Sequence, residues 1–387
     1  MDTLARRLRN PRILIIATLL SSSVLLGTQC PFGLTFEARL ELKAAGIDKY
    51  LGDFTPVSST DVGDGWTKHT FDTDGGNGPI CIAGTPYSVF TKAGDPKKLL
   101  IFEQGGGACW QGFYFCNVLA EDQEPPAPPV GIWDFSSPDN PFANHSIVYM
   151  PYCDGSVFSG DNDVPDASFP FGPVRFHRGL RNQSAGMDVA KATFPQAKNI
   201  TVAGSSAGGV GVAGFAPFLV RFKYGNSIVL NVFNDAGPVA INLNETAAIA
   251  ARAADWQFGQ FYPSSCTECD DMGQATAVIQ WRLDNDLTIR EAFYETDADA
   301  TNRFFLNVPT QAQYRDILLT QHDPLNASHP LRYKRFIVSG DASHTALQSP
   351  LFYTQEIDGV VLSDWTEDFL KFKPGWVDLV EDLVPFP

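Results

Sequence analysis

Five short apolar runs, each bounded by turn residues, recur along the chain. They lie at 99–102, 147–150, 200–203, 228–232 and 336–338. Because these runs do not alternate apolar with polar positions and contain many β-branched side chains, they predict strands that are buried on both faces. Such strands are typical of a parallel sheet that helices cover on both sides.

Helix-compatible segments lie between the runs, at 184–194 and at 207–222. Strand and helix therefore alternate, which predicts an α/β fold with a mostly parallel sheet flanked by helices. An entry β-region is expected over 31–95. The stretch 240–330 is rich in helix formers and is expected to cover the site as an insertion. The proline-rich segment 121–141 is expected to be a surface loop, because proline lacks a backbone donor.

Composition fits one packed domain. Of the 387 residues, 44% are hydrophobic and 19% are charged, which excludes general disorder. No internal repeat or convincing boundary divides the chain, so we expect a single domain over 31–387. The formal net charge of −16 argues against nucleic acid and anionic membrane surfaces as partners, because both attract basic proteins.

The N-terminus carries an export pattern. Four arginines within 6–12 precede an apolar run at 13–20 and further small and apolar residues. This pattern predicts a signal peptide over 1–29, with an uncleaved N-terminal anchor as the alternative. We expect a secreted, periplasmic or cell-envelope protein with no stable membrane span in its mature form. Lipidation of Cys30 is a minority alternative, because 27–29 make a poor lipobox.

Six cysteines follow Cys30, an even number that fits disulfides in an exported protein. Their connectivity cannot be read from the sequence alone. Cys266 and Cys269 have C-x-x-C spacing, but no second pair of this kind and no nearby histidine completes a zinc set. This favours a local disulfide over a metal site, and no metal or cofactor is expected.

A nucleophile motif follows the third apolar run. The sequence Gly-Ser-Ser-Ala-Gly-Gly at 204–209 begins where the strand-like run ends and leads into a helix-compatible segment. In a G-x-S-x-G turn the glycines permit a sharp strand-to-helix bend that exposes the central serine. Ser206 is that serine. The alternative is that these small residues only allow a helix to pack closely against a strand.

A serine needs a base to accept its proton, and in this fold class the histidine follows the nucleophile in the chain. His322, His329 and His344 do so. His344 comes just after the last strand-like run on a Gly-containing loop, whereas the other two lie near prolines in an apparent surface turn. His344 is therefore the predicted general base.

The acid that orients the histidine should lie between nucleophile and base. Asp235 follows the fourth apolar run, and Asp284 follows Gln280-Trp281 farther along the chain. The alternative for both is a purely structural role, as a helix cap or a solvated surface charge. These residues alone leave the choice open.

A glycine run at 105–107 follows the first apolar run directly. Consecutive glycines let backbone N–H groups approach a substrate oxygen, and a second donor is expected from Ala207, after the nucleophile. A phosphate-binding loop is the alternative, but its Lys-Ser/Thr pair is missing. Four aromatic residues come next, as candidates for an acyl pocket or sugar-stacking wall or simply for core packing: Trp110, Phe113, Tyr114 and Phe115.

Taken together, these motifs resemble those of the pectin acetylesterase and Notum carboxylesterase family, in its bacterial branch, which has the α/β-hydrolase fold. The likeness extends from Cys81 to His344. It rests on the glycine run within 103–116, Pro-Tyr-Cys-Asp-Gly-Ser-Val at 151–157, the motif at 204–209, Asn-Asp-Ala-Gly at 234–237, Gln280-Trp281 with Asp284, and Ser343-His344. Gln104 departs from the family pattern, because it stands between the acidic residue and the glycines.

The resemblance implies a Ser206, Asp284 and His344 triad, with Asp235 as a structural carboxylate. It implies oxyanion donors in the region of Gly106 and Gly107, together with Ala207. It also implies the disulfides Cys81–Cys153 and Cys109–Cys116, which leave Cys266 to pair with Cys269.

These expectations describe a serine carboxylesterase that hydrolyses acyl esters. The expected substrate is an acetyl ester, with an acetylated polysaccharide as the possible carrier. A lipase or polyester depolymerase would use the same triad and is the main alternative, and a non-catalytic binding protein is the other. In each enzymatic reading the serine attacks the ester carbonyl and backbone N–H groups bind the oxyanion.

Overall fold

The computed structural model describes residues 33–73, 76–120 and 129–386. The expected signal peptide or anchor at 1–29 and the candidate lipidation site Cys30 lie outside the described residues, as does 121–128 of the proline-rich segment. Within the described residues, every helix is too short or too polar to cross a bilayer.

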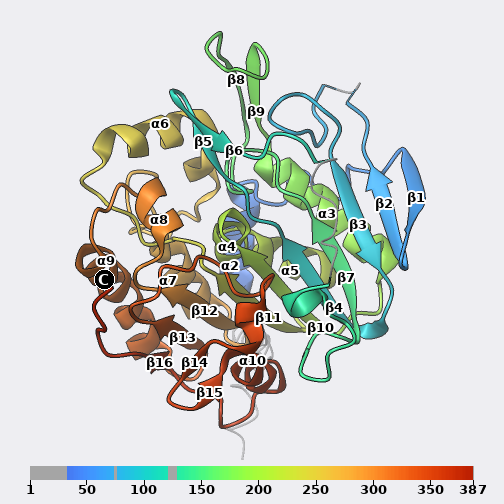
Figure 1. The fold of residues 1–387 in the computed structure, drawn as a ribbon. Helices are drawn as coiled ribbons and strands as arrows, with labels where there is room; N and C mark the ends of the chain where they lie inside the picture. Colours follow the sequence, from blue (N-terminus) through green and yellow to red (C-terminus); the bar gives the residue numbers. More distant parts are fainter. Residues whose placement is uncertain (1–32, 74–75, 121–128, 387) are drawn as a thin grey trace, which may run out of the picture. The chain divides into compact units, whose positions relative to one another are not determined.

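A ten-stranded sheet runs through the described part of the chain (Figure 1). Its first three strands are antiparallel: β1 (Ser58–Gly63), β2 (Trp66–Thr70) and β3 (Ser88–Lys92). The other seven are parallel and follow in the order β7 (His145–Met150), β4 (Asp95–Glu103), β10 (Asn199–Ser205), β11 (Val229–Asp235), β12 (Arg290–Thr296), β13 (Tyr333–Val338) and β16 (Leu379–Val380). The mostly parallel sheet predicted from the apolar runs is confirmed.

Helices and loops bury both faces of the sheet, and strand residues alternate between two cores. Leu99 and Ile101 belong to one hydrophobic cluster, whereas Leu100 and Phe102 belong to the other. The first cluster packs under α2 (Phe36–Ala44), α3 (Gly179–Thr193), α4 (Ala207–Ala213), α5 (Ala216–Tyr224), α7 (Thr276–Asn285) and α9 (Gln311–Ser328). The second packs under α10 (Leu362–Lys371) and the 3-10 turns η1 (Gly131–Trp133) and η3 (Pro350–Tyr353).

Three details differ from the sequence expectations. The single helix expected over 207–222 is two helices, α4 and α5, because α4 ends at Gly214 and Pro217 begins a new first turn. The entry region contains α2 as well as strands. In the stretch 240–330, α7 and α9 pack into the core, and α6 (Thr246–Trp256), η2 (Phe258–Phe261) and α8 (Ala300–Phe305) line the site together with Val278 of α7.

Two hairpins project beyond the carboxyl ends of the parallel strands (Figure 1). One consists of β5 (Gly107–Trp110) and β6 (Phe113–Cys116), the other of β8 (Asn162–Pro165) and β9 (Val174–His177). A further small hairpin, β14 (Glu356–Ile357) with β15 (Val360–Val361), precedes α10.

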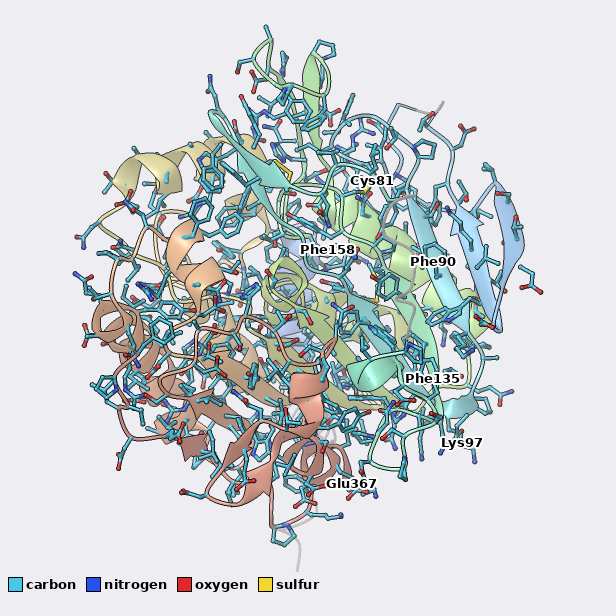
Figure 2. The ribbon with its side chains drawn as sticks, in the orientation of Figure 1. Cys81, Phe90, Lys97, Phe135, Phe158 and Glu367 are labelled. Atoms are coloured by element: carbon cyan, nitrogen blue, oxygen red, sulfur yellow. A yellow bond between two sulfur atoms is a disulfide. The ribbon has the colours of Figure 1, made fainter. Side chains whose placement is uncertain are left out.

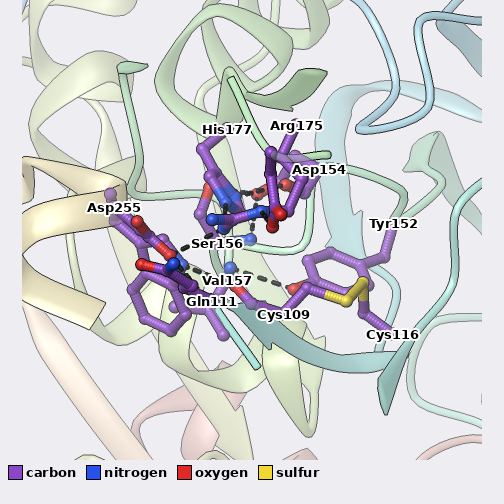
Figure 3. The surroundings of a disulfide bond; sticks show 12 residues. Cys109, Gln111, Cys116, Tyr152, Asp154, Ser156, Val157, Arg175, His177 and Asp255 are labelled. Carbon is purple, nitrogen blue, oxygen red and sulfur yellow. Dashed lines mark hydrogen bonds and ion pairs between the residues drawn. A yellow bond between two sulfur atoms is a disulfide. The ribbon is translucent and has the colours of Figure 1, made fainter. Parts of the chain in front are cut away.

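The three expected disulfides are present. Cys109–Cys116 closes the β5–β6 hairpin (Figure 3). Cys81, labelled in Figure 2, is bonded to Cys153, and Cys266 is bonded to Cys269. The backbone of Cys109 is also tied down on both sides, because its N–H donates to Gly155 O at 2.8 Å and its carbonyl accepts from Trp256 Nε1 at 2.8 Å. The hairpin that carries the glycine run is therefore firmly anchored.

Candidate active site

Ser206 occupies a strained turn between β10 and α4. Its backbone has φ 57° and ψ −120°, in a region that non-glycine residues rarely adopt. The surrounding glycines are required by space: a Cβ at Gly208 would lie 2.0 Å from Glu103 O, and one at Gly204 would lie 2.4 Å from Gly208 O. The Ser206 N–H donates to Asp235 O at 2.8 Å, which holds the turn to the neighbouring strand β11. This is the geometry of a nucleophile elbow.

His344 lies between this serine and an acid. Its Nε2 is 2.8 Å from Ser206 Oγ, and its Nδ1 is 2.6 Å from Asp299 Oδ2. The Asp299 side chain is fully buried, whereas 21% of the His344 side chain is exposed. The arrangement brings a hydroxyl, a base and an orienting carboxylate into one hydrogen-bonded line, as acyl transfer requires.

Asp299 is positioned by its place after β12, at the start of α8. Its Oδ1 accepts the N–H of Asn302 at 2.8 Å and so caps the helix, while Oδ2 is left for His344. Asn302 is itself fixed, because its Nδ2 donates to Ala236 O and to Glu295 Oε2. The acid is therefore held by a backbone cap and needs no movement to reach the imidazole.

The structure places Asp299, and not the expected Asp284, beside His344 Nδ1. Asp284 is near the end of α7, where Oδ1 is 3.0 Å from His329 Nε2 and 53% of the side chain is exposed. Helix α7 leads into the first residue of β12, so its end lies at the amino edge of the parallel sheet. Ser206, Asp299 and His344 all follow the carboxyl ends of strands, at the opposite edge, where sites in open α/β sheets lie. Asp284 therefore cannot orient His344.

Asp235 ties the histidine loop to the elbow. The last residue of β11, it is fully buried. Its Oδ1 accepts from Ala346 N at 2.9 Å, and its Oδ2 accepts from Leu347 N at 3.0 Å and from Ser205 Oγ at 2.5 Å. Burial raises the pKa of this carboxyl to about 6. Asp235 makes no hydrogen bond to His344 and fixes its loop instead.

Asp235→Asn should destabilise the fold and reduce activity only modestly. An amide can replace one carboxylate oxygen as acceptor but presents N–H to the donors at the other, which costs about 1–3 kcal/mol of unfolding free energy. The raised pKa of Asp235 gives stability that is fully present below pH 4 and is lost as the pH rises through 6. The deficit of the variant should therefore be larger at pH 4 than at pH 7. Denaturant unfolding at both values measures it, and an equal deficit would contradict the assignment.

The glycine run reaches the elbow from the neighbouring strand β4. A Cβ at Gly105 would lie 2.6 Å from Ser205 O and 2.8 Å from Ser206 Cβ, so only glycine permits this approach. Gly107 has φ 79°, and a Cβ there would lie 2.0 Å from Phe115 O. Gly107 and Ala207 line the same cavity as Ser206, and the carbonyl of Gly106 accepts from Asn117 N at 2.8 Å. The expected oxyanion segment is thus beside the nucleophile, and its donor role stays a prediction.

An apolar cavity of about 140 Å³ extends from Ser206. Its wall combines α4 and the two residues that follow it with α6, α7 and α8, and includes Trp110, Val210, Phe215, Ile249, Trp256 and Phe305. The sequence predicted that 240–330 covers the site but not which of its residues line it, because isolated aromatic residues in helical segments are more often part of a core.

Of the three aromatic residues expected to bind substrate, Trp110 and Phe113 lie together at the cavity and Tyr114 lies elsewhere. Trp110 lines the cavity, and Phe113 stacks on it with ring centroids 4.1 Å apart. Tyr114 points to the other side of β6, where its hydroxyl donates to Asp166 Oδ2 at 2.6 Å and its ring packs on Phe169. Tyr114 does not line this cavity, since neighbouring side chains of a strand face opposite ways, and its contact with substrate stays a prediction.

Comparisons with known proteins agree on one family. Residues 68–239 match the family model described as pectinacetylesterase. The chain is 31% identical over 143 residues to the palmitoleoyl-protein carboxylesterase notum2 of Xenopus laevis, and 30% identical over 142 residues to notum1a of Danio rerio. Each match spans 34% of this chain and 28% of the relative.

The fold agrees over a longer stretch. The crystal structure of the Wnt deacylase Notum from Drosophila superposes with a TM-score of 0.58 over 81% of this chain and 95% of that one, at 18% identity. At this identity the likeness supports the fold alone. The match to the family model includes Ser206, Asp235 and the glycine run, and it ends before Asp299 and His344.

Proposed function

We propose that this chain is a serine esterase of the pectin acetylesterase and Notum carboxylesterase family, and that it hydrolyses carboxylic esters through Ser206. The observation that carries the proposal is the hydrogen-bonded line from Ser206 Oγ through His344 to Asp299, with contacts of 2.8 Å and 2.6 Å. A helix cap or a packed core has no need for a serine in a strained turn against an imidazole.

In the proposed reaction His344 Nε2 removes the proton of Ser206 as Oγ attacks the ester carbonyl. Asp299 accepts the Nδ1 proton of His344, so that Nε2 is free to act as the base, and it stabilises the imidazolium that forms. Backbone N–H groups of the glycine run and Ala207 bind the developing oxyanion. The protonated His344 then gives its proton to the leaving alcohol, and water releases the acid from the acyl-enzyme by the same steps.

The cavity favours an acyl chain longer than acetyl, which makes the lipase-like alternative the second candidate. At about 140 Å³ it is close to the engineered cavities that bind benzene, so roughly six carbon atoms fit. Each buried methylene contributes about 0.8 kcal/mol. An acetyl group would leave most of this apolar surface without a partner.

A p-nitrophenyl ester series tests the reaction and the chain length together. We expect kcat/KM to rise by about fourfold per methylene from acetate and to level off near hexanoate, as transfer free energies predict. Acetate release from acetylated pectin and xylan should be measured beside it. A maximum at acetate with efficient release from a polysaccharide would favour the deacetylase, and no turnover of any ester would overturn the proposed function.

Labelling by a fluorophosphonate probe locates the nucleophile independently of substrate choice. The probe reacts with serines that an adjacent base activates, so the label should appear on the peptide that contains Ser206. A label elsewhere would contradict the assignment.

The three disulfides support the proposal that the protein is exported, because such bonds persist in oxidising compartments. We propose secretion or retention in the cell envelope.

A further inference from the structure

Arg252 differs from every other arginine in the described residues. The others all donate hydrogen bonds to carboxylates, carbonyls or neighbouring side chains, whereas Arg252 makes no hydrogen bond or ion pair. Arg252 makes a cation–π contact instead, with its guanidinium carbon 5.3 Å from the Trp110 ring centroid. A guanidinium carries five N–H donors, and here none of them has an acceptor.

This unpaired cation belongs to the cavity of the proposed active site. Ile249, Arg252 and Trp256 are spaced i, i+3 and i+7 on α6, and all three line the cavity that contains Ser206. Burial lowers the pKa of Arg252 to about 10, so the group remains charged at neutral pH. The described wall around it is mostly apolar, and Asp271 is its one acid.

The neighbouring acid on α6 is already committed elsewhere. Asp255 accepts from Arg175 Nη1 at 2.6 Å and from Gln111 N at 2.7 Å, and these contacts are drawn in Figure 3. Arg175 also binds Asp166 at 2.8 Å, so the pair forms part of a closed network under the β5–β6 hairpin. Arg252 stands outside this network, and its partly exposed guanidinium is free to bind an anion that enters the cavity.

We propose that Arg252 binds a carboxylate at the far end of the acyl group, so that the substrate is a monoester of a dicarboxylic acid. This inference rests on the proposed esterase function. An uncharged acyl chain would fill the apolar wall and displace water from the guanidinium without offering it an acceptor, which is unfavourable. A carboxylate matches the planar fork of a guanidinium, and the Trp110 ring fixes the plane in which the fork lies.

Two esters with the same six-carbon acyl chain test the inference. p-Nitrophenyl hexanoate ends in a methyl group, and the mono-p-nitrophenyl ester of adipic acid ends in a carboxylate. Arg252→Met should lower kcat/KM for the adipate ester by about 10- to 100-fold, the range for a lost charge-assisted hydrogen bond. Turnover of hexanoate should change by less than about threefold, because the methionine keeps the apolar packing. Arg252→Lys should fall between, since it keeps the charge and loses the fork.

Arg39→Met is the matched control. Arg39 also lies over an aromatic ring, Phe222 at 4.4 Å, but it is not part of the cavity wall. Its loss removes the same charge and should leave kcat/KM for both esters unchanged.

A third ester, 4-carboxyphenyl hexanoate, tests where the charge binds, because it carries the carboxylate on the leaving alcohol.

The outcomes are separable. An equal loss for hexanoate and adipate in Arg252→Met would show a packing role and overturn the inference, as would wild-type turnover of hexanoate without turnover of adipate. If Arg252→Met lowered kcat/KM only for 4-carboxyphenyl hexanoate, the inference would also be overturned, because Arg252 would then bind a carboxylate on the alcohol and not on the acyl group. If the wild type hydrolyses none of the three, the proposed function itself fails and the inference falls with it.

Discussion

Ser206→Ala should lower kcat by about 10⁶-fold, to the background that binding and the oxyanion site alone supply. The reason is that Ser206 Oγ is the atom proposed to form the acyl-enzyme, and His344 Nε2 at 2.8 Å is its hydrogen-bond partner. Thermal unfolding should barely change, because alanine and serine bear a similar strain at φ 57° and the side chain is only partly buried. Initial rates with p-nitrophenyl hexanoate and calorimetry of both proteins measure the two effects.

The adjacent serine provides the control. Ser205 is buried and donates to Asp235 Oδ2 at 2.5 Å, away from the histidine. Ser205→Ala should keep kcat within about tenfold and lose about 1 kcal/mol of stability for the missing hydrogen bond. Turnover by Ser206→Ala above about one per cent of wild type would exclude Ser206 as the nucleophile.

The strands that consist of a continuous apolar run could be predicted from the sequence. Strand β12, which precedes Asp299, could not. All seven residues of β12 are buried, but they include Arg290, Glu291 and Glu295. These side chains have partners inside the fold: Glu291 accepts two 2.7 Å bonds from Arg282, and Glu295 accepts from Asn302 and Tyr314. Their partners lie outside the strand, 7 to 19 residues away, so the segment by itself does not look like a buried strand.

Because β12 was not predicted, Asp299 was not recognised as a candidate acid. Once β12 is known, an acid just beyond its carboxyl end, between nucleophile and base in the chain, is the natural candidate to orient the histidine. Without it, the resemblance assigned the role to Asp284, the acid next to a recognisable motif. Position in a linear motif carried no information about the edge of the sheet at which the residue lies.

The turn at Ser206 and the position of His344 were easier to predict because their constraints are local. Glycines at 204 and 208 and a serine between a strand and a helix specify one backbone geometry, and that geometry is observed. His344 needed only a place after the last long strand. Arg252 illustrates the reverse case, since its lack of a partner is visible only when the whole surroundings of α6 are known.

Asp299→Asn should lower kcat by as much as roughly 10⁴-fold, as the equivalent change does in serine proteases. An asparagine amide facing His344 Nδ1 favours the tautomer that carries its proton on Nε2, and that tautomer cannot accept the proton of Ser206. KM should change little, because Asp299 is fully buried behind the histidine. The fold should survive, because asparagine also caps helices and can still accept the N–H of Asn302.

Asp284→Asn makes the same chemical change at the acid that the resemblance favoured. Its side chain is half exposed and contacts His329 and Gln280, at the edge of the sheet opposite Ser206. We expect kcat within about twofold of wild type, because an exposed ion pair contributes at most about 1 kcal/mol to stability and makes no contact with the reacting atoms. Measuring kcat, KM and unfolding for both variants decides between the two acids. A larger kcat loss at Asp284 than at Asp299 would mean that the hydrogen bond between His344 and Asp299 is not the one used in catalysis.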